Sequence, residues 1–184
     1  MEFHPLALGG AFSIELSPHT DERGAFTRLM CMNELLSIGH SQNFAQVNHS
    51  LTRSSGTVRG MHFQNPPRAE VKVVTCLSGK VFDVIVDLRK DSPTFLRWLG
   101  LELSEDNRRM IYIPAGFAHG FQALVDNCGL LYFHTDFYAP EAEGGIRYDD
   151  EVVEIAWPLR VSHVSPRDLS FERIQTTSFH GISL

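Results

Sequence analysis

The stretch Pro114-Ala115-Gly116-Phe117-Ala118-His119-Gly120-Phe121 decides how the chain folds around it. It follows the short apolar run 110–113 and leads into a second run, 117–125. Proline and glycine are the residues that interrupt strands and make turns. The pattern therefore predicts two strands joined by a turn, with the side chain of His119 directed into the space that the strands enclose.

The segments around this stretch also have the character of strands. Short runs with many β-branched residues recur along the chain, separated by turn residues, and they cover 71–77, 81–88, 95–103 and 130–138. The turn at Ser78-Gly79 predicts a hairpin between the first two runs. One short helix is expected at 32–38, closed by Gly39. The segment after Trp157-Pro158 is less regular, and we expect it to wrap over the strands.

Composition limits the class of protein. The chain has 184 residues, 43% hydrophobic and 21% charged, which predicts one folded domain over 1–184. Its net charge of −6 argues against nucleic-acid binding. Three widely spaced cysteines without a CxxC pair argue against a disulfide framework and against a zinc knuckle. We find no signal peptide and no membrane-spanning run, and expect a cytoplasmic protein with no membrane partner.

Many short strands with almost no helix predict an all-β sandwich or barrel, with jelly rolls and cupins among the candidates. The PxGxxH pattern ending at His119 is the second motif of cupins. Metal-binding cupins also need a first motif with His-x-His and a Glu. Here that stretch reads His62-Phe63-Gln64, so that Gln64 stands at the second ligand position and only the distant Glu70 remains. We therefore expect no metal and no cofactor.

Acid–base chemistry is the alternative to a metal. His62 is a candidate general base because imidazole titrates near neutral pH. Lys72 begins an apolar run, and strand alternation places it on the same face as Val74 and Cys76, toward the barrel lumen. A buried lysine is costly unless an anionic group pairs with it. In the competing interpretation the register is shifted and Lys72 faces solvent.

Taken together, several stretches resemble the dTDP-4-dehydrorhamnose 3,5-epimerase family over about residues 5–170. The similarity lies in Asp21-Glu22-Arg23-Gly24, Gln46-x-Asn48, Val58 to Gln64, Lys72, Gly79 to Arg89, Ser92 to Phe95, Ile113 to Phe121, Tyr138 to Glu141, Trp157-Pro158 and Ser165 to Asp168. No single motif is specific, but the set is. The resemblance implies a cupin jelly roll that works without a metal, as a homodimer, on a dTDP-linked 4-keto-6-deoxy sugar.

The resemblance also implies a mechanism and its residues. The ketone acidifies the hydrogens on C3 and C5, a base removes each, and the enolate is reprotonated from the other face. His62 matches the base, Asp168 the carboxylate that orients it, Lys72 the cation that stabilises the enolate, and Tyr132 the acid opposite His62. In the competing interpretation Tyr132 is a core aromatic whose hydroxyl binds the backbone.

A further set matches positions that contact substrate in the family: Arg23, Arg28, Gln46, Asn48, Arg59, His119, Tyr138, Glu143 and Arg167. Arginines suit a diphosphate because of their bidentate geometry, although each could instead form a surface ion pair. Residues near Arg23 reach the neighbouring subunit's site in the family, which implies that the dimer takes part in function.

The chain departs from the family pattern at four positions of interest. Arg28 stands where many members have a glutamate, Val47 replaces an aspartate, and Phe133-His134 replaces a usual Lys-Thr. We expect His134 to be a solvated strand residue. These changes leave open a 3-only or 5-only epimerase, a 4-keto sugar isomerase, or a non-catalytic cupin that binds a sugar nucleotide or a metal.

Overall fold

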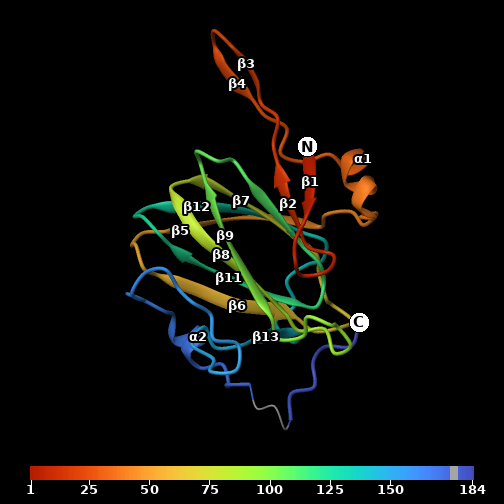
Figure 1. The fold of residues 1–184 in the computed structure, drawn as a ribbon, viewed down its shortest axis with the longest axis vertical. Coiled ribbons are helices and arrows are strands. Elements are labelled where there is room, and N and C mark those ends of the chain that lie inside the picture. Colours follow the sequence, from red (N-terminus) through yellow and green to blue (C-terminus); the bar gives the residue numbers. More distant parts are fainter. Residues whose placement is uncertain (175–177) are drawn as a thin grey trace.

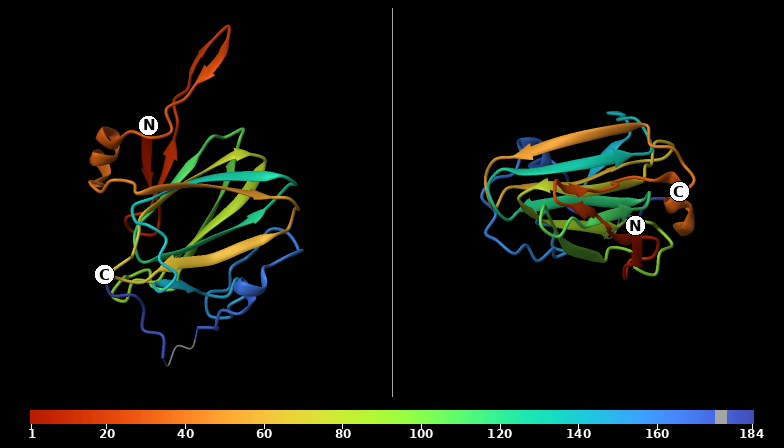
Figure 2. Two further views of the ribbon diagram at one scale, coloured as in Figure 1. Left: turned by 180° about the vertical axis from the view of Figure 1, so that it is seen from behind. Right: turned by 90° about the horizontal axis from the view of Figure 1, so that it is seen from above.

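Two antiparallel sheets face each other in the computed structural model, which describes residues 1–174 and 178–184 (Figure 1). The six-stranded sheet has the order β1 (Glu2–Pro5), β2 (Phe12–Glu15), β10 (Met110–Ile113), β7 (Lys72–Ser78), β12 (Cys128–His134) and β5 (Gln46–Thr52). The five-stranded sheet has the order β13 (Glu143–Gly145), β6 (Val58–Gln64), β11 (Phe117–Ala123), β8 (Lys80–Asp87) and β9 (Trp98–Ser104). This arrangement confirms the predicted all-β jelly roll, and Figure 2 shows the two layers from behind and from above.

The predicted hairpin at Ser78-Gly79 is wrong, although the turn exists. Gly79 has the positive φ of 73° that favours glycine, and it joins β7 directly to β8. However, β7 pairs with β10 and β12, whereas β8 pairs with β11 and β9. The chain changes sheets at this turn, so that the apolar faces of the two strands meet across the core.

The strand boundaries differ from the prediction mainly where polar residues alternate with apolar ones. Strands β5 and β6 were not predicted, because their outward and cavity-facing positions carry polar side chains. The run predicted over 95–103 begins only at Trp98, after a turn in which Leu96 has φ 61°. The run predicted over 130–138 ends at His134.

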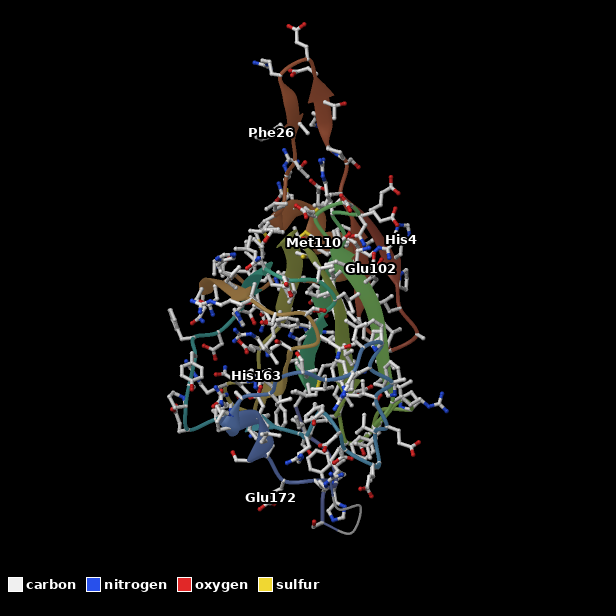
Figure 3. The ribbon with its side chains drawn as sticks, turned by 90° about the vertical axis from the view of Figure 1, so that its left-hand side faces the viewer. His4, Phe26, Glu102, Met110, His163 and Glu172 are labelled. Atoms are coloured by element: carbon white, nitrogen blue, oxygen red, sulfur yellow. The ribbon has the colours of Figure 1, made fainter. Side chains whose placement is uncertain are left out.

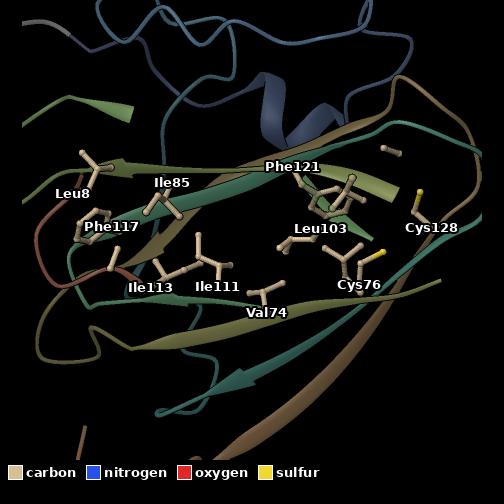
Figure 4. Packing of buried hydrophobic residues seen from close by; sticks show 14 residues of the cluster. Leu8, Val74, Cys76, Ile85, Leu103, Ile111, Ile113, Phe117, Phe121 and Cys128 are labelled. Atoms are coloured by element: carbon tan, nitrogen blue, oxygen red, sulfur yellow. The ribbon is translucent and has the colours of Figure 1, made fainter. Parts of the chain in front are cut away.

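The main core lies between the two sheets and is shown in Figure 4. Val74 and Ile111 from the six-stranded sheet pack with Ile85 and Phe121 from the five-stranded sheet. A second cluster, which includes Met61, covers the other side of the five-stranded sheet with residues of the C-terminal segment. This segment runs along β6 and β13 (Figure 1), as expected for a chain end that wraps over the strands.

Helices are few and short. The predicted helix is present as α1 (Met32–Leu35) followed by the 3-10 turn η1 (Leu36–Ile38), and Gly39 closes it in the left-handed conformation. A second helix, α2 (Pro166–Leu169), lies in the C-terminal segment. Among residues 1–174 and 178–184, no helix is long and apolar enough to cross a membrane.

A two-stranded hairpin, β3 (His19–Asp21) with β4 (Gly24–Phe26), projects from the sheets (Figures 1 and 3). Figure 3 places Phe26 on this hairpin, far from the labelled Met110. The Phe26 side chain is 73% exposed.

We predict that Ile111→Ala lowers the free energy of unfolding by about 2–5 kcal/mol, because it leaves a cavity between the two sheets. Ile111 has no exposed surface. Denaturant unfolding measures the change, with the exposed Val152→Ala as the control, expected to stay within about 0.5 kcal/mol of the parent. Equal stability of the two variants would contradict this description of the core.

Candidate active site

One cavity of about 630 Å³ opens between the two sheets. Residues of β5, β7 and β12 form one wall, residues of β6 and β11 form the other, and α2 lies beside the second wall. The cavity brings together eleven of the predicted site residues: Gln46, Asn48, Arg59, His62, Lys72, His119, Tyr132, Tyr138, Glu143, Arg167 and Asp168.

His62 and Asp168 form a hydrogen-bonded pair on the second wall. His62 Nε2 lies 2.8 Å from Asp168 Oδ1, and the N–H of Gly60 donates to Asp168 Oδ2 at 3.1 Å. Ser165 caps α2 by accepting from the N–H of Asp168, which fixes the helix that carries the carboxylate. The pair therefore joins two segments that are far apart in the chain.

The environment of Asp168 keeps it ionised. Burial raises the pKa of this carboxyl, but the hydrogen bond and charge of His62 and the N–H of Gly60 outweigh burial, so that the pKa is lowered overall. An ionised carboxylate only accepts hydrogen bonds, so the proton of neutral His62 lies on Nε2. Nδ1 is left with its lone pair free to act as a base.

Two glycines explain why His62 lies next to His119. Gly60 has φ 124°, and a Cβ there would lie 2.6 Å from the Cα of Gly120. The close approach lets β6 and β11 pair with His62 directly opposite His119. The two imidazole groups are thereby fixed side by side on one wall.

His119 has a carboxylate partner that the sequence analysis missed. Its Nε2 lies 2.8 Å from Oδ2 of Asp83, which is completely buried. Burial raises the pKa of Asp83, and the charges of His119 and Lys72 oppose this shift. The sequence did contain a signal for this pair. Asp83 is a carboxylate within the apolar run 81–88, and a buried charge requires a partner, which here is His119.

Lys72 faces the cavity, so the interpretation that places it in solvent is wrong. Its Nζ donates to the carbonyl oxygen of His62 at 3.3 Å and lies 3.4 Å from Glu70 Oε1. Burial lowers the pKa of Lys72, while the Glu70 carboxylate opposes this effect. Glu70 thus supplies the anionic partner that the buried ammonium requires.

Tyr132 lies on the wall opposite His62. Its hydroxyl shares a hydrogen bond of 3.2 Å with Ser50 Oγ, a side chain rather than the backbone. Burial raises the pKa of the phenol, so the hydroxyl keeps its proton at neutral pH. The cavity therefore has an imidazole with a free ring nitrogen on one sheet and a protonated phenol on the other.

His134 is not the solvated residue that we expected. Its side chain is 13% exposed, because strand alternation places it on the same face of β12 as Tyr132. Nδ1 of His134 lies 2.9 Å from Glu70 Oε2, and its ring stacks on that of Tyr132 at 6.0 Å between centroids. The Glu70–His134 pair joins residues 64 positions apart, which the sequence pattern did not indicate.

Polar and charged groups surround the mouth of the cavity. Arg59 Nε donates to Thr52 Oγ1 at 3.0 Å, and Arg167 forms an ion pair with Glu143. The exposed Tyr138 donates from its hydroxyl to Glu143 Oε2 at 3.4 Å. Two guanidinium groups at the mouth suit an anionic ligand such as a diphosphate.

Comparison with known proteins identifies the family. The model of the dTDP-4-dehydrorhamnose 3,5-epimerase family matches residues 5–176. The chain belongs to this family. The enzyme of that name from Salmonella typhimurium is 43% identical over 152 residues, which cover 80% of this chain and 81% of the relative. A dTDP-4-dehydrorhamnose 3-epimerase from Streptomyces niveus is 38% identical and covers 91% of this chain and 81% of its own.

A solved structure of the family has a similar fold. The dTDP-6-deoxy-D-glucose-3,5-epimerase of Legionella pneumophila, in complex with dTDP-4-keto-L-rhamnose, superposes with a TM-score of 0.89 at 37% identity. The match covers 94% of this chain and 92% of that structure. The fold and the family that the sequence predicted are both confirmed.

Arg23 and Arg28 lie outside the cavity of their own chain. Arg23 is at the tip of the β3–β4 hairpin and pairs with Asp21, and the exposed Arg28 pairs with Glu34. A role in substrate binding stays a prediction for both arginines, and for Arg23 it is expected at the site of a neighbouring subunit.

The side chains of the cupin metal position do not fit a metal. Gln64 uses its amide on backbone groups, accepting from the N–H of Ala139 and donating to the carbonyl of Arg68. His62, His119 and Glu70 each have the partners described above. Within residues 1–174 and 178–184, the group close enough to share an ion is the exposed set Glu2, His4 and Glu15, away from the cavity.

We predict that neutral His62 carries its proton on Nε2, because that atom faces the Asp168 carboxylate. Two-bond ¹⁵N–¹H correlation spectra of the imidazole groups measure the tautomer. Asp168→Asn keeps the size but offers an amide N–H to Nε2, and should move the proton to Nδ1. The exposed His4 is the internal control and should not change. A proton on Nδ1 in the parent protein would contradict the assignment of the base.

Proposed function

We propose that residues 1–184 form a single epimerase domain that inverts C3 and C5 of dTDP-4-dehydro-6-deoxy-D-glucose to give dTDP-4-dehydro-L-rhamnose. One observation carries the proposal. The His62–Asp168 pair and the Tyr132 hydroxyl project from opposite sheets into one cavity that also contains the Lys72 ammonium. This arrangement suits inversion of a carbon next to a ketone, with a base on one face, an acid on the other and a cation to stabilise the carbonyl oxygen as it becomes an enolate.

The reaction begins when His62 Nδ1 removes a proton from a carbon next to the ketone. The electrons of that C–H bond move to the carbonyl oxygen, and Lys72 stabilises the resulting enolate. Asp168 stabilises the imidazolium that forms. A proton is then delivered to the opposite face of the carbon from the Tyr132 wall, and the ketone is restored. Fixed charges in a dry cavity are worth roughly 10²–10³ in rate, and the base a further 10²–10⁴.

The mouth of the cavity supports binding of a nucleotide-linked substrate. Arg59 and Arg167 supply charge for the diphosphate, and the exposed ring of Tyr138 lies beside them. Gln46 and Asn48 add hydrogen-bonding groups from β5. When the diphosphate binds, its oxygens would replace Thr52 as the partner of Arg59 and Glu143 as the partner of Arg167.

Inversion of a single carbon is the second candidate function. The similarity to a relative named as a 3-epimerase favours it, because the same base and acid can serve one carbon or two. The experiment below separates the two functions.

We also propose that the protein works as a homodimer. Val47 and Leu51 on the outer face of the edge strand β5 are 54% and 53% exposed, and the β3–β4 hairpin presents Phe26 away from the sheets. Apolar side chains in these places are explained by a second copy of the chain. The hairpin would then bring Arg23 toward the partner.

The main prediction is that incubation with dTDP-4-keto-6-deoxyglucose in D₂O places deuterium at both C3 and C5 and yields the L-rhamno ketone. NMR of the sugar measures both results. Deuterium and inversion at one carbon only would select the single-carbon epimerase.

The base provides the control for that experiment. His62→Ala should slow exchange by roughly 10²–10⁴ at each carbon that the parent protein exchanges. Binding of the sugar nucleotide without any exchange by the parent protein would support a non-catalytic cupin instead and would falsify the proposed reaction.

For the dimer, we predict that light scattering gives twice the chain mass of 20.7 kDa. Val47→Asp combined with Leu51→Asp should give the monomer mass, because two charges would be buried at the contact. Val152→Asp, at an exposed position in the C-terminal segment, is the matched control and should remain dimeric. A parent protein that is monomeric at assay concentrations would rule out this assembly.

A further inference from the structure

The cavity contains a second histidine–carboxylate pair on the wall of Tyr132. Glu70 Oε2 lies 2.9 Å from His134 Nδ1, and both side chains are largely buried, at 7% and 13% exposure. Burial raises the pKa of Glu70, but the hydrogen bond from His134 and the charge of Lys72 outweigh it, so that the pKa is lowered overall. Glu70 is thus an ionised partner for His134, as Asp168 is for His62.

The pair is positioned to act on the cavity rather than on solvent. His134 and Tyr132 are two residues apart on β12 and project to the same side, with their rings stacked at an angle of 21°. His134 also lies directly across from Lys72 in the pairing of β12 with β7. The imidazole is therefore next to the group that would hold the enolate oxygen.

The proposed reaction needs two protons from this wall. Inversion at C3 and at C5 each takes a proton on the face opposite His62. The Tyr132 hydroxyl is one donor, and it is bonded to Ser50 rather than to His134, so that no proton passes directly between the two rings. His134 is a titratable group two residues along β12 that lines the same cavity.

We propose that His134, oriented by Glu70, is a second general acid that delivers a proton to one of the two carbons beside the ketone, while Tyr132 serves the other. This inference rests on the proposed function. In the step, the enolate carbon forms a bond to the proton on His134 Nε2, the N–H bond breaks, and its electron pair stays on the nitrogen. His62 holds the proton removed from the substrate, and exchange of both histidines with water restores the starting state.

The surroundings of His134 accommodate both protonation states. With Nδ1–H directed at Glu70, the Nε2 lone pair lies 3.4 Å from Asn48 Nδ2, which can donate to it. Rotation of the Asn48 amide by 180° presents its oxygen to Nε2–H of the imidazolium. The charged groups around the ring are Glu70 and Lys72, and Glu70 contacts both cations, so that the imidazolium is paired when it forms.

The test measures exchange and inversion separately at C3 and C5 in D₂O, with dTDP-4-keto-6-deoxyglucose as the substrate. His134→Gln keeps a polar side chain but removes the acid. Because His62 still removes the proton and can return a deuteron to the same face, we expect exchange to continue at both carbons. At one carbon, inversion should fall by about 10²-fold or more. At the other carbon, the ratio of inversion to exchange should equal that of the parent protein. Tyr132→Phe should show the complementary pattern.

Two further variants complete the design. Glu70→Gln can still accept from Nδ1–H but lacks the charge, and should reduce inversion at the same carbon by less than His134→Gln does. His4→Gln, which removes a histidine from an exposed pair with Glu15, should behave as the parent protein. The ratio of inversion to exchange is measured within each variant and does not depend on the fraction of folded protein.

The outcomes separate the two levels of the hypothesis. Parent-like inversion at both carbons in His134→Gln would overturn the role of His134 and leave the proposed function intact. A parallel loss of exchange and inversion at both carbons would also overturn it, because it would show a structural effect. Absence of any exchange with the parent protein would overturn the proposed function, and the role of His134 with it.

Discussion

Charge that is removed from water between two sheets has to be paired, and this constraint organises the cavity. Asp168 is held by His62 and by the N–H of Gly60, and Asp83 by His119. Lys72 and His134 share Glu70. An unpaired ion in these positions would cost several kcal/mol, so each carboxylate fixes the position of its partner as well as its charge. The same pairs that make burial possible therefore hold the reacting groups in place.

The topology of the jelly roll determines on which face each group acts. His62 and His119 lie on β6 and β11, whereas Lys72, Tyr132 and His134 lie on β7 and β12 of the other sheet. A substrate bound between the sheets therefore has the two histidines on one side and Lys72, Tyr132 and His134 on the other. Neither group of side chains can reach the opposite side without disrupting the sheet that carries it. Opposite faces of the sugar thus meet different chemistry because of the strand order, not because of loop conformation. Asp168 is the exception, since it comes from the C-terminal segment that packs on β6, and the base is complete only when that segment is docked.

The sequence predicted the parts of this arrangement that depend on local pattern. The turn at 114–116 follows from its proline and glycine, and the direction of His119 and the burial of Lys72 follow from strand alternation. Asp168 and Tyr132 came from the resemblance to the family, which the comparisons confirm. The hairpin at Ser78-Gly79 failed because a tight turn has the same local signal whether the next strand joins the same sheet or the opposite one. Glu70 and His134 were not recognised as a pair because their contact depends on the pairing of β12 with β7, which no local pattern encodes.

The electrostatics of the cavity fit a reaction that separates charge without changing the total. When His62 takes a proton from a neutral ketone, an imidazolium and an enolate form together. In the proposed reaction Asp168 is already directed at the imidazole that becomes charged, and the Lys72 ammonium lies in the same cavity as the enolate that it would stabilise. The burial that lowers the pKa of Lys72 would also strengthen its attraction to the enolate, and Glu70 opposes that lowering. Glu70 contacts both Lys72 and His134, so that in the proposed reaction one carboxylate would position the cation at the enolate oxygen and the second acid.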